Sequence, residues 1–317
     1  MNYQTIHAFD LATGEVVWRY ERPIYGPANV VARDGRVLFA GSKAVALEAA
    51  TGRELWRYTP DSNASFSVTA ADERAFYFGT EQHQVYAVDV NDGTLLWNTD
   101  VGPDWPYHGI VRGVSVGGDT LYAGLERYYA ENGYIASGMI FALDRYSGEI
   151  LWSYEVGSGE DLHYIRGAPR VAGRFLIAAD YRGNAYITLD RFTGKEIWRY
   201  VGDYRYFGAE HSPVVRGDTV FAASQDKQVT AFDLATGEIF WQTEMPGGNI
   251  AIALCGNRLL VNYFGLAVLD PGTGEVLGRG YEYDNDADFP TTGFAVAGDR
   301  AYVLGVLAAY GFQCPSS

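Results

Sequence analysis

A ten-residue pattern that recurs along the whole chain constrains the fold more than any other feature of the sequence. Its copies read FDLATGEVVW, LEAATGRELW, VDVNDGTLLW, LDRYSGEILW, LDRFTGKEIW, FDLATGEIFW and LDPGTGEVLG, and they begin at residues 9, 47, 88, 143, 189, 232 and 269. Self-similarity at a period of about 40 residues is typical of radially repeated or stacked structural units. The last copy has Gly278 where the other six have tryptophan.

Each copy has the chemistry of a tight turn between two β-strands. An acidic side chain before the turn can accept hydrogen bonds from backbone amides two or three residues further on. A glycine such as Gly148 can adopt the positive φ that a short bulged hairpin requires. The tryptophan that follows lies on the outer strand, where its ring can cover the neighbouring unit and its N–H can donate a hydrogen bond. We therefore expect a docking role for six tryptophans: Trp18, Trp56, Trp97, Trp152, Trp198 and Trp241.

The segments between the copies predict the rest of the unit. Short runs rich in Val, Ile, Tyr, Phe and Trp alternate with Gly-Asp, Thr-Gly and Asn-Gly turns, and helical periodicity is nearly absent. Small residues at 113–115, 167–169 and 293–295 indicate innermost strands that crowd around a central axis. The sequence thus predicts an all-β fold, a seven-bladed β-propeller of four-stranded antiparallel blades, with residues 1–317 forming a single domain.

The two ends of the chain predict how this ring closes. The sequence begins with an outer strand pair at residues 4–20 and ends with an inner pair at about residues 292–306. We expect these N-terminal and C-terminal strands to pair into one composite blade, because closure removes exposed sheet edges. Residues 307–314 could instead form an additional strand, which would make an eighth, truncated blade.

The A-x-D-x-x-T-G-x-x-x-W motif resembles the tryptophan-docking repeat of the PQQ-like β-propeller family, the quinoprotein-type and BamB-like proteins. The resemblance covers nearly the whole chain and implies a propeller, but it does not imply the quinone. PQQ dehydrogenases of the eight-bladed type are much longer, and many carry a vicinal Cys-Cys pair beside the quinone together with a calcium ion. The two cysteines here, Cys255 and Cys314, are not adjacent, so we expect no cofactor. Whether they form a disulfide stays open at this point.

Composition narrows the choice of partners and compartment. The net charge is −15 and the 24 Lys and Arg residues are scattered, which excludes duplex nucleic acid because its phosphates are bound by clustered basic residues. The longest apolar runs are strand-sized, so we expect no transmembrane segment. No signal peptide follows Met1, and the chain opens almost directly inside a repeat. The protein is therefore either cytoplasmic or extracytoplasmic with its natural leader absent from this chain. The start inside a repeat favours the second, so we expect an extracytoplasmic protein, periplasmic or on the cell surface, and we expect a monomer.

Most candidate ligand-binding residues lie in the segments that lead from one blade's outer strand into the next blade's inner strand. These segments share one face of a propeller and approach its axis, so side chains from three successive blades can converge there. Their His, Arg, Glu and Tyr side chains suit an anionic or carbohydrate ligand, a transition metal, or acid–base chemistry. The same side chains can also simply cap strand ends or line a wetted channel. The candidates are Tyr107, His108, Arg112, His163, Tyr164, Arg166, Glu210 and His211.

A long insertion separates two of the repeats. Residues 125–138 predict a loop on the same face of the propeller. Its tyrosines, Tyr128, Tyr129 and Tyr134, can cover the mouth of the ring or contact a partner. An insertion at a surface loop is also simply tolerated.

One acidic segment resembles a calcium-binding loop. An EF-hand requires glycine at the sixth position and glutamate at the twelfth, where Phe289 and Val296 stand. We therefore expect a solvated acidic loop and no metal site, with these carboxylates as the weak candidates: Asp284, Asp286 and Asp288.

These observations predict a non-catalytic extracytoplasmic propeller that acts as a binding scaffold, BamB-like or sensor-like. The expected partner is a protein or a small anionic or carbohydrate ligand. The alternative is an enzyme of the polysaccharide lyase or hydrolase type that uses the face carrying His108, His163 and His211. A PQQ-dependent dehydrogenase is not expected.

Overall fold

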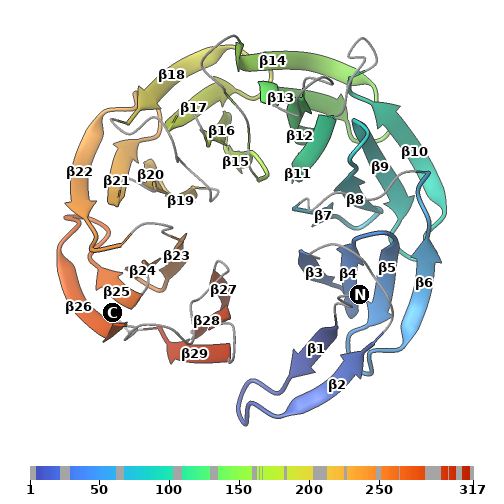
Figure 1. The fold of residues 1–317 in the computed structure, drawn as a ribbon, viewed down its shortest axis with the longest axis horizontal. Helices are drawn as coiled ribbons and strands as arrows, with labels where there is room; N and C mark the ends of the chain where they lie inside the picture. The colour runs from blue at the N-terminus through green and yellow to red at the C-terminus, as the bar shows by residue number, and fades with distance from the viewer. Residues whose placement is uncertain are drawn as a thin grey trace. The chain divides into compact units, whose positions relative to one another are not determined.

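A computed structural model gives the fold of the chain (Figure 1). It describes residues 5–21, 29–61, 68–102, 109–128, 135–158, 163, 165, 167–181, 184–202, 213–224, 227–247, 251–263, 265–282, 294–298, 300–304 and 309–314. Every regular element in this part of the chain is a β-strand, which confirms the all-β prediction. The chain divides into two compact units, Met1–Val171 and Ala172–Ser317, and each is described by itself.

The first unit contains one two-stranded sheet and three four-stranded sheets, all antiparallel (Figure 1). The two-stranded sheet pairs β1 (Ile6–Phe9) with β2 (Val16–Tyr20). The four-stranded sheets follow in chain order: β3 (Val30–Arg33), β4 (Arg36–Ala40), β5 (Ala44–Glu48) and β6 (Glu54–Tyr58); β7 (Ala70–Ala71), β8 (Ala75–Gly79), β9 (Gln84–Asp89) and β10 (Leu95–Asp100); β11 (Gly109–Gly117), β12 (Thr120–Tyr128), β13 (Ile135–Asp144) and β14 (Ile150–Ser158).

The second unit continues the same pattern, and its first sheet begins at the boundary between the units. Three four-stranded sheets are followed by one of three strands. Their members are β15 (Arg170–Ala172), β16 (Phe175–Asp180), β17 (Ala185–Asp190) and β18 (Glu196–Val201); β19 (Val214–Arg216), β20 (Thr219–Ala223), β21 (Gln228–Asp233) and β22 (Ile239–Glu244); β23 (Ala251–Cys255), β24 (Arg258–Asn262), β25 (Gly265–Leu269) and β26 (Val276–Glu282); and β27 (Phe294–Ala297), β28 (Arg300–Leu304) and β29 (Ala309–Gln313). Six complete four-stranded sheets and two partial ones agree roughly with the predicted seven blades.

Five of the seven turns before an outer strand have both predicted hydrogen bonds from backbone amides. Asp144 Oδ1 accepts from the backbone N–H of Tyr146 at 3.0 Å and of Ser147 at 2.8 Å, and these donors lower the pKa of Asp144. Gly148 follows with φ +77°, in the region that glycine occupies without a steric penalty. The same carboxylate-to-amide bonds form at four other copies: Asp10, Asp190, Asp233 and Asp270.

The tryptophans join neighbouring sheets as their spacing predicts. The Trp97 indole N–H donates to the carbonyl of Arg145 at 3.0 Å, and a Cβ built on Gly148 would lie 2.6 Å from Trp97 Cε3. The turn glycine therefore supplies both the positive φ and the space for the ring. Four further tryptophans pack in the same way, each against the turn glycine of the next sheet with a backbone carbonyl as acceptor: Trp18 on Gly52 with Ala49, Trp56 on Gly93 with Val90, Trp198 on Gly237 with Leu234, and Trp241 on Gly274 with Pro271.

The expected burial of the docking tryptophans holds for only half of them. The side chains of Trp56, Trp97 and Trp198 are buried. Those of Trp18, Trp152 and Trp241 are half-buried. All six tryptophans stand on the outermost strand of a sheet, so this shared position does not account for the difference in burial.

The last sheet contains a strand beyond the predicted inner pair at about residues 292–306. β28 pairs with β27 on one side and with β29 (Ala309–Gln313) on the other, so the additional strand considered for residues 307–314 is present. A hairpin neighbour closes only a short loop along the chain, which costs little conformational entropy. The pairing of residues 4–20 with residues 292–306 would join the two units and stays a prediction; within the first unit, β1 pairs with β2.

The predicted loop at residues 125–138 is largely strand. β12 continues to Tyr128 and β13 begins at Ile135, and the two strands are paired antiparallel along their length. Tyr128 does not cover a mouth but hydrogen-bonds within the sheet, as described below. Tyr129 and Tyr134 lie outside the described residues.

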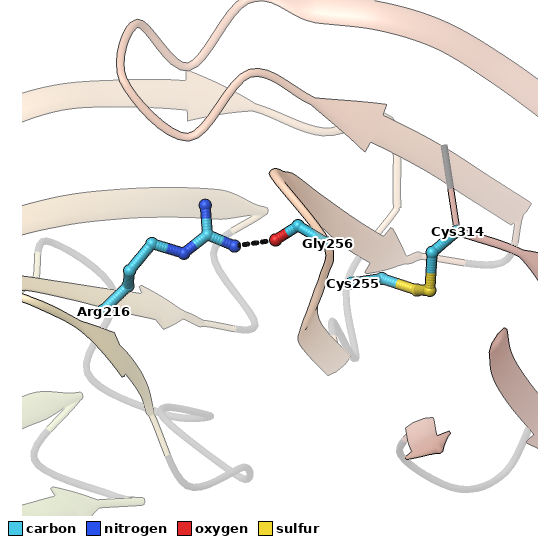
Figure 2. Close-up of a disulfide and its surroundings, with 4 residues drawn as sticks. All are labelled: Arg216, Cys255, Gly256 and Cys314. Atoms are coloured by element: carbon cyan, nitrogen blue, oxygen red, sulfur yellow. Dashed lines mark hydrogen bonds between the residues drawn. A yellow bond between two sulfur atoms is a disulfide. The ribbon is translucent and has the colours of Figure 1, made fainter. Parts of the chain in front are cut away.

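A disulfide joins the two cysteines of the chain, which answers the question left open by the sequence. Cys255 ends β23 and Cys314 follows β29, and their Cα atoms are 5.3 Å apart (Figure 2). Both side chains are buried beside Leu260 and Ala301. Next to this bond, Arg216 donates to the carbonyl of Gly256. The disulfide therefore fastens β29 to the preceding four-stranded sheet.

Candidate functional site

Two of the eight predicted ligand-binding residues lie in the described part of the chain, Arg112 and His163. The other six lie outside the described residues, and so do the weak metal candidates: Tyr107, His108, Tyr164, Arg166, Glu210 and His211, with Asp284, Asp286 and Asp288. What the structure adds is therefore the environment of Arg112 and His163 and of the strands that hold them.

Arg112 lies on an innermost strand that is as crowded as its small residues predict. The N–H of Val68 donates to the carbonyl of Arg112 at 3.0 Å, and Val114 N–H donates to the carbonyl of Val68 at 2.9 Å. A Cβ on Gly113 would collide with the backbone of Gly167 and Ala168. Only glycine fits where the backbones approach this closely. β11 is thus held by its neighbours on both sides.

A β-bulge points the Arg112 side chain at a buried carboxylate. Val111 pairs with Leu125 and Gly113 pairs with Gly124, so Arg112 is the extra residue of β11. Arg112 Nε donates to Glu126 Oε2 at 2.6 Å, and Arg112 Nη2 donates to the Tyr128 hydroxyl at 3.0 Å. The Tyr128 hydroxyl in turn donates to Glu126 Oε2 at 2.6 Å. The three side chains form one closed hydrogen-bonded group on β11 and β12.

Burial strengthens the electrostatic interactions among Arg112, Glu126 and Tyr128. The Glu126 side chain is fully buried and that of Arg112 is 20% exposed. Burial opposes the charge on Arg112, but Glu126 and Tyr128 outweigh it and raise the pKa of the guanidinium. Burial and the Glu126 charge both raise the pKa of Tyr128. Arg112 is therefore a cation already neutralised within its own sheet, which weakens its predicted role as an anion ligand.

Sequence reasoning missed Glu126 because it was assigned to a loop. The usable signal was its place in the strand pattern: Ala123, Leu125 and Arg127 alternate with Gly124, Glu126 and Tyr128, and period-2 alternation is the mark of a strand. A carboxylate on the same face as Tyr128, in a strand next to one bearing Arg112, predicts an ion pair.

His163 has different surroundings from Arg112. Its ring lies against the backbone of Gly157, near the end of β14, where a Cβ would be 2.7 Å from His163 Cγ. The residue is half-buried. The contact with glycine is that of a packed side chain at a strand end, one of the two roles that the sequence allowed.

A second histidine, His83, was not predicted and has a clearer structural role. It adopts φ +58° and is buried. Its N–H donates to the carbonyl of Gly109 at 3.1 Å, and its carbonyl accepts from Val101 N–H at 2.9 Å. A Cβ on Gly102 would lie 2.9 Å from His83 Cγ. One residue therefore fixes both the end of β10 and the start of β11.

The first unit contains a second buried ion pair at its turns. Asp72 Oδ2 accepts from Arg145 Nη1 at 2.9 Å and from the Tyr77 hydroxyl at 2.8 Å, and Asp72 Oδ1 accepts from the N–H of Ala75 at 2.8 Å. Burial favours the neutral acid, but these donors outweigh it and lower the pKa of Asp72. The pair links two adjacent sheets and every charge in it is matched, so we interpret it as structural.

Comparison with protein families gives one match that covers most of the chain. The family model described as outer membrane protein assembly factor BamB matches residues 2–243 and 136–281. BamB of Yersinia pestis is 25% identical over 193 residues, which are 58% of this chain and 45% of that protein. Quinohemoprotein alcohol dehydrogenase ADH-IIG of Pseudomonas putida is 33% identical over 128 residues, 37% of this chain and 16% of that protein. The chain thus matches less than half of the length of each of these relatives.

Solved structures show the same fold at low identity. BamB of Moraxella catarrhalis superposes with a TM-score of 0.69 at 22% identity, over 92% of this chain and 85% of that one. Quinohemoprotein alcohol dehydrogenase of Comamonas testosteroni superposes with a TM-score of 0.71 at 16% identity, over 95% of this chain and 67% of that one. At these identities the likeness shows the fold alone, which is that of a β-propeller. Within the described residues, no helix is long and apolar enough to cross a bilayer.

Proposed function

Because the chain belongs to the PQQ-like repeat family described as outer membrane protein assembly factor BamB, we propose that it is a non-catalytic propeller scaffold that binds a protein partner outside the cytoplasm. Docked tryptophans join neighbouring sheets within each unit, and rigid elements lose little conformational entropy when a partner binds. The partner that the family description suggests is a component of outer membrane protein assembly.

The observation that carries this proposal is the closed group of Arg112, Glu126 and Tyr128. Arg112 is the predicted ligand-binding cation on an inner strand, and it is engaged by a fully buried carboxylate at 2.6 Å, which leaves less of its charge for a ligand. Buried charges are stable when they are paired and hydrogen-bonded, and such pairs fix the packing of a sheet. This structural use of Arg112, Glu126 and Tyr128 supports a scaffold over an enzyme.

The disulfide supports the extracytoplasmic location. Cys255 and Cys314 are both buried and joined. Disulfides form and persist in oxidising compartments and are rare in the cytosol. The proposal therefore places the protein in the periplasm or at the cell surface.

A quinone cofactor does not fit these residues. The quinohemoprotein relatives share only a part of their blades with this chain. The only two cysteines are 59 positions apart and bonded to each other, so they cannot supply a vicinal pair beside a quinone. No step involving the quinone is therefore assigned to this protein.

Chemical cross-linking in the source cells tests the proposed function. Cross-linking before envelope fractionation should recover the protein with the envelope, joined to an outer membrane assembly component. Deleting its gene should lower the amount of folded outer membrane β-barrel proteins. Unchanged β-barrel levels, together with turnover of a uronic polysaccharide by the purified protein, would instead establish the enzyme alternative.

A further inference from the structure

Large apolar side chains are exposed at one repeated place in the fold. Of the 17 that are exposed among the described residues, ten occupy the two positions just before the docking tryptophan or its replacement Gly278. They are Val16, Val17, Leu55, Leu95, Ile150, Leu151, Ile197, Ile239, Phe240 and Leu277.

The register of the outer strands explains this exposure. On β22, Trp241 pairs with Ala231 and Ile239 pairs with Phe232, so Phe240 is an extra residue without a partner on β21. Each of the seven outer strands has this bulge directly before the tryptophan position, at β2, β6, β10, β14, β18, β22 and β26. A bulged residue is released from the ladder and the strand bends around it, which can turn its side chain outward. The extra residue is among the exposed side chains on six of these strands, whereas on β10 it is Leu96, which packs against the core.

Two of these strands screen the bulged residue with an ion pair. On β6, Arg57 Nη2 and Glu54 Oε2 are 2.7 Å apart on either side of Leu55. On β18, Arg199 and Glu196 are 3.0 Å apart on either side of Ile197. Positions i and i+3 of a regular strand face opposite ways, but the extra residue brings both to one side. Charged side chains on an edge strand and their aliphatic stems oppose unwanted association there.

β14 and β22 lack this protection. The positions of the glutamate and arginine are taken by Ile150 and Ser153 on β14, and by Ile239 and Gln242 on β22. Each strand therefore exposes two adjacent apolar side chains, Ile150 at 38% with Leu151 at 52%, and Ile239 at 44% with Phe240 at 54%.

The strands β2, β10 and β26 also lack this ion pair, but only β14 and β22 combine two exposed apolar neighbours with negative charge alone; β10 exposes Leu95 alone. The segments of β14 and β22 read EILWSYE at 149–155 and EIFWQTE at 238–244, with a glutamate at each end and no Lys or Arg between. β2 also exposes two valines, but Arg19 follows Trp18 there. An apolar centre with an acidic rim is complementary to a segment that is apolar with basic flanks.

We propose that the outer edges of β14 and β22 are docking sites for apolar, basic polypeptide segments of a partner. This rests on the proposed scaffold function and assigns it a surface. The partner's apolar side chains cover the Ile150–Leu151 or Ile239–Phe240 pair, and its Lys or Arg side chains contact the flanking glutamates. The bulge prevents continuous strand addition at these positions, so the contact is made by side chains rather than by a shared ladder.

The assignment is tested by placing the glutamate–arginine pair on β14 and β22, and by removing it from β6 and β18. The screened variant carries Ile150→Glu, Ser153→Arg, Ile239→Glu and Gln242→Arg, and the unscreened variant carries Glu54→Ile, Arg57→Gln, Glu196→Ile and Arg199→Gln. All eight positions lie on outer strands. Gln242 already donates to the Tyr200 hydroxyl as Arg57 does to that of Tyr20, so the screened variant should keep the wild-type unfolding midpoint. The unscreened variant removes Glu54, which accepts from the buried Tyr20 hydroxyl at 2.6 Å, so its midpoint should fall and its binding is measured at a temperature at which it is fully folded. The probe is a short peptide that alternates lysine with leucine, and the control peptide has glutamate in place of lysine.

Calorimetry should show binding of the lysine peptide to the wild-type protein. We expect the screened variant to bind it about tenfold more weakly, the unscreened variant to bind it more tightly, and added salt to weaken both interactions. Equal affinity of the wild type and the screened variant, or equal binding of the glutamate peptide, would refute the docking sites. If the screened variant still forms the cross-linked complex in cells, the scaffold function stands and this surface assignment fails.

Discussion

Trp97 and Gly148 show how single residues connect neighbouring sheets. The tryptophan is 8% exposed, its N–H is bonded to the Arg145 carbonyl, and its ring fills the space above the glycine. Replacing Trp97 with Ala should lower the free energy of unfolding by about 3–5 kcal/mol, the range for deleting a large buried aromatic side chain. Urea titration measures the change in the free energy of unfolding. Trp18→Ala is the matched control and should cost less because Trp18 is half-buried; equal losses would contradict the docking interpretation.

The glycine can be tested separately from the tryptophan. Gly14 and Gly148 have nearly the same φ, +73° and +77°, but a Cβ on Gly14 would meet nothing within 4 Å whereas one on Gly148 would meet Trp97. Gly14→Ala should therefore cost only the strain of a left-handed residue, about 1 kcal/mol. Gly148→Ala should cost about 2 kcal/mol more, because the indole must also move. Identical unfolding midpoints would show that the ring does not determine this position.

At the scale of the element, the turn carboxylates make stability depend on pH. Hydrogen bonds from Ser147 and Thr236 lower the pKa of Asp144 and Asp233 in the folded protein. Each group thus adds stability above its unfolded pKa of about 3.9, and this stability is lost as pH falls through the lower folded pKa. Asp144→Asn with Asp233→Asn keeps the acceptor oxygen but cannot titrate. The difference in unfolding free energy from the wild type should shrink below about pH 4, and parallel curves across this range would contradict it.

The strand β29 gives a second test at this scale, because a disulfide holds it to β23. Closing a loop over a separation of 59 residues stabilises the fold by about 4 kcal/mol in the chain-entropy estimate. The Cys255→Ser, Cys314→Ser variant should lose about this much stability in the second unit. Hydrogen exchange should accelerate at residues 309–313 and stay unchanged in β12 of the first unit. Retained protection at 309–313 would mean that pairing with β28 alone holds the strand.

Sequence reasoning succeeded where one residue type is required by local geometry. The acidic residue, the glycine and the tryptophan of each repeat each have a single physical task, so their spacing predicted turns, outer strands and docking. It gives less where the outcome depends on which segments pair. β29 carries no turn motif, and its pairing with β28 follows from proximity along the chain. Glu126 was missed for a related reason, because the length of the β12–β13 hairpin is set by pairing rather than by any local signal.

At the scale of the whole molecule, the remaining question is whether these blades serve a quinone enzyme or a scaffold. The matched quinohemoprotein is much longer than this chain, with 16% of its length aligned here. Cys255 and Cys314 are committed to a structural disulfide, and Arg112 is committed to Glu126. These commitments argue against a vicinal cysteine pair and against an uncompensated arginine beside a quinone.

We therefore expect that PQQ added with calcium will not bind the purified full chain. Equilibrium dialysis should leave equal free quinone on both sides, absorbance should be unchanged, and no alcohol or glucose should be oxidised in the presence of an artificial electron acceptor. A genuine quinohemoprotein alcohol dehydrogenase, treated in the same way, is the positive control. The propeller fold by itself does not provide a quinone-binding site, because particular side chains hold a cofactor. Stoichiometric retention of the quinone would mean that residues outside the described strands supply its ligands, and the scaffold function would then have to be abandoned.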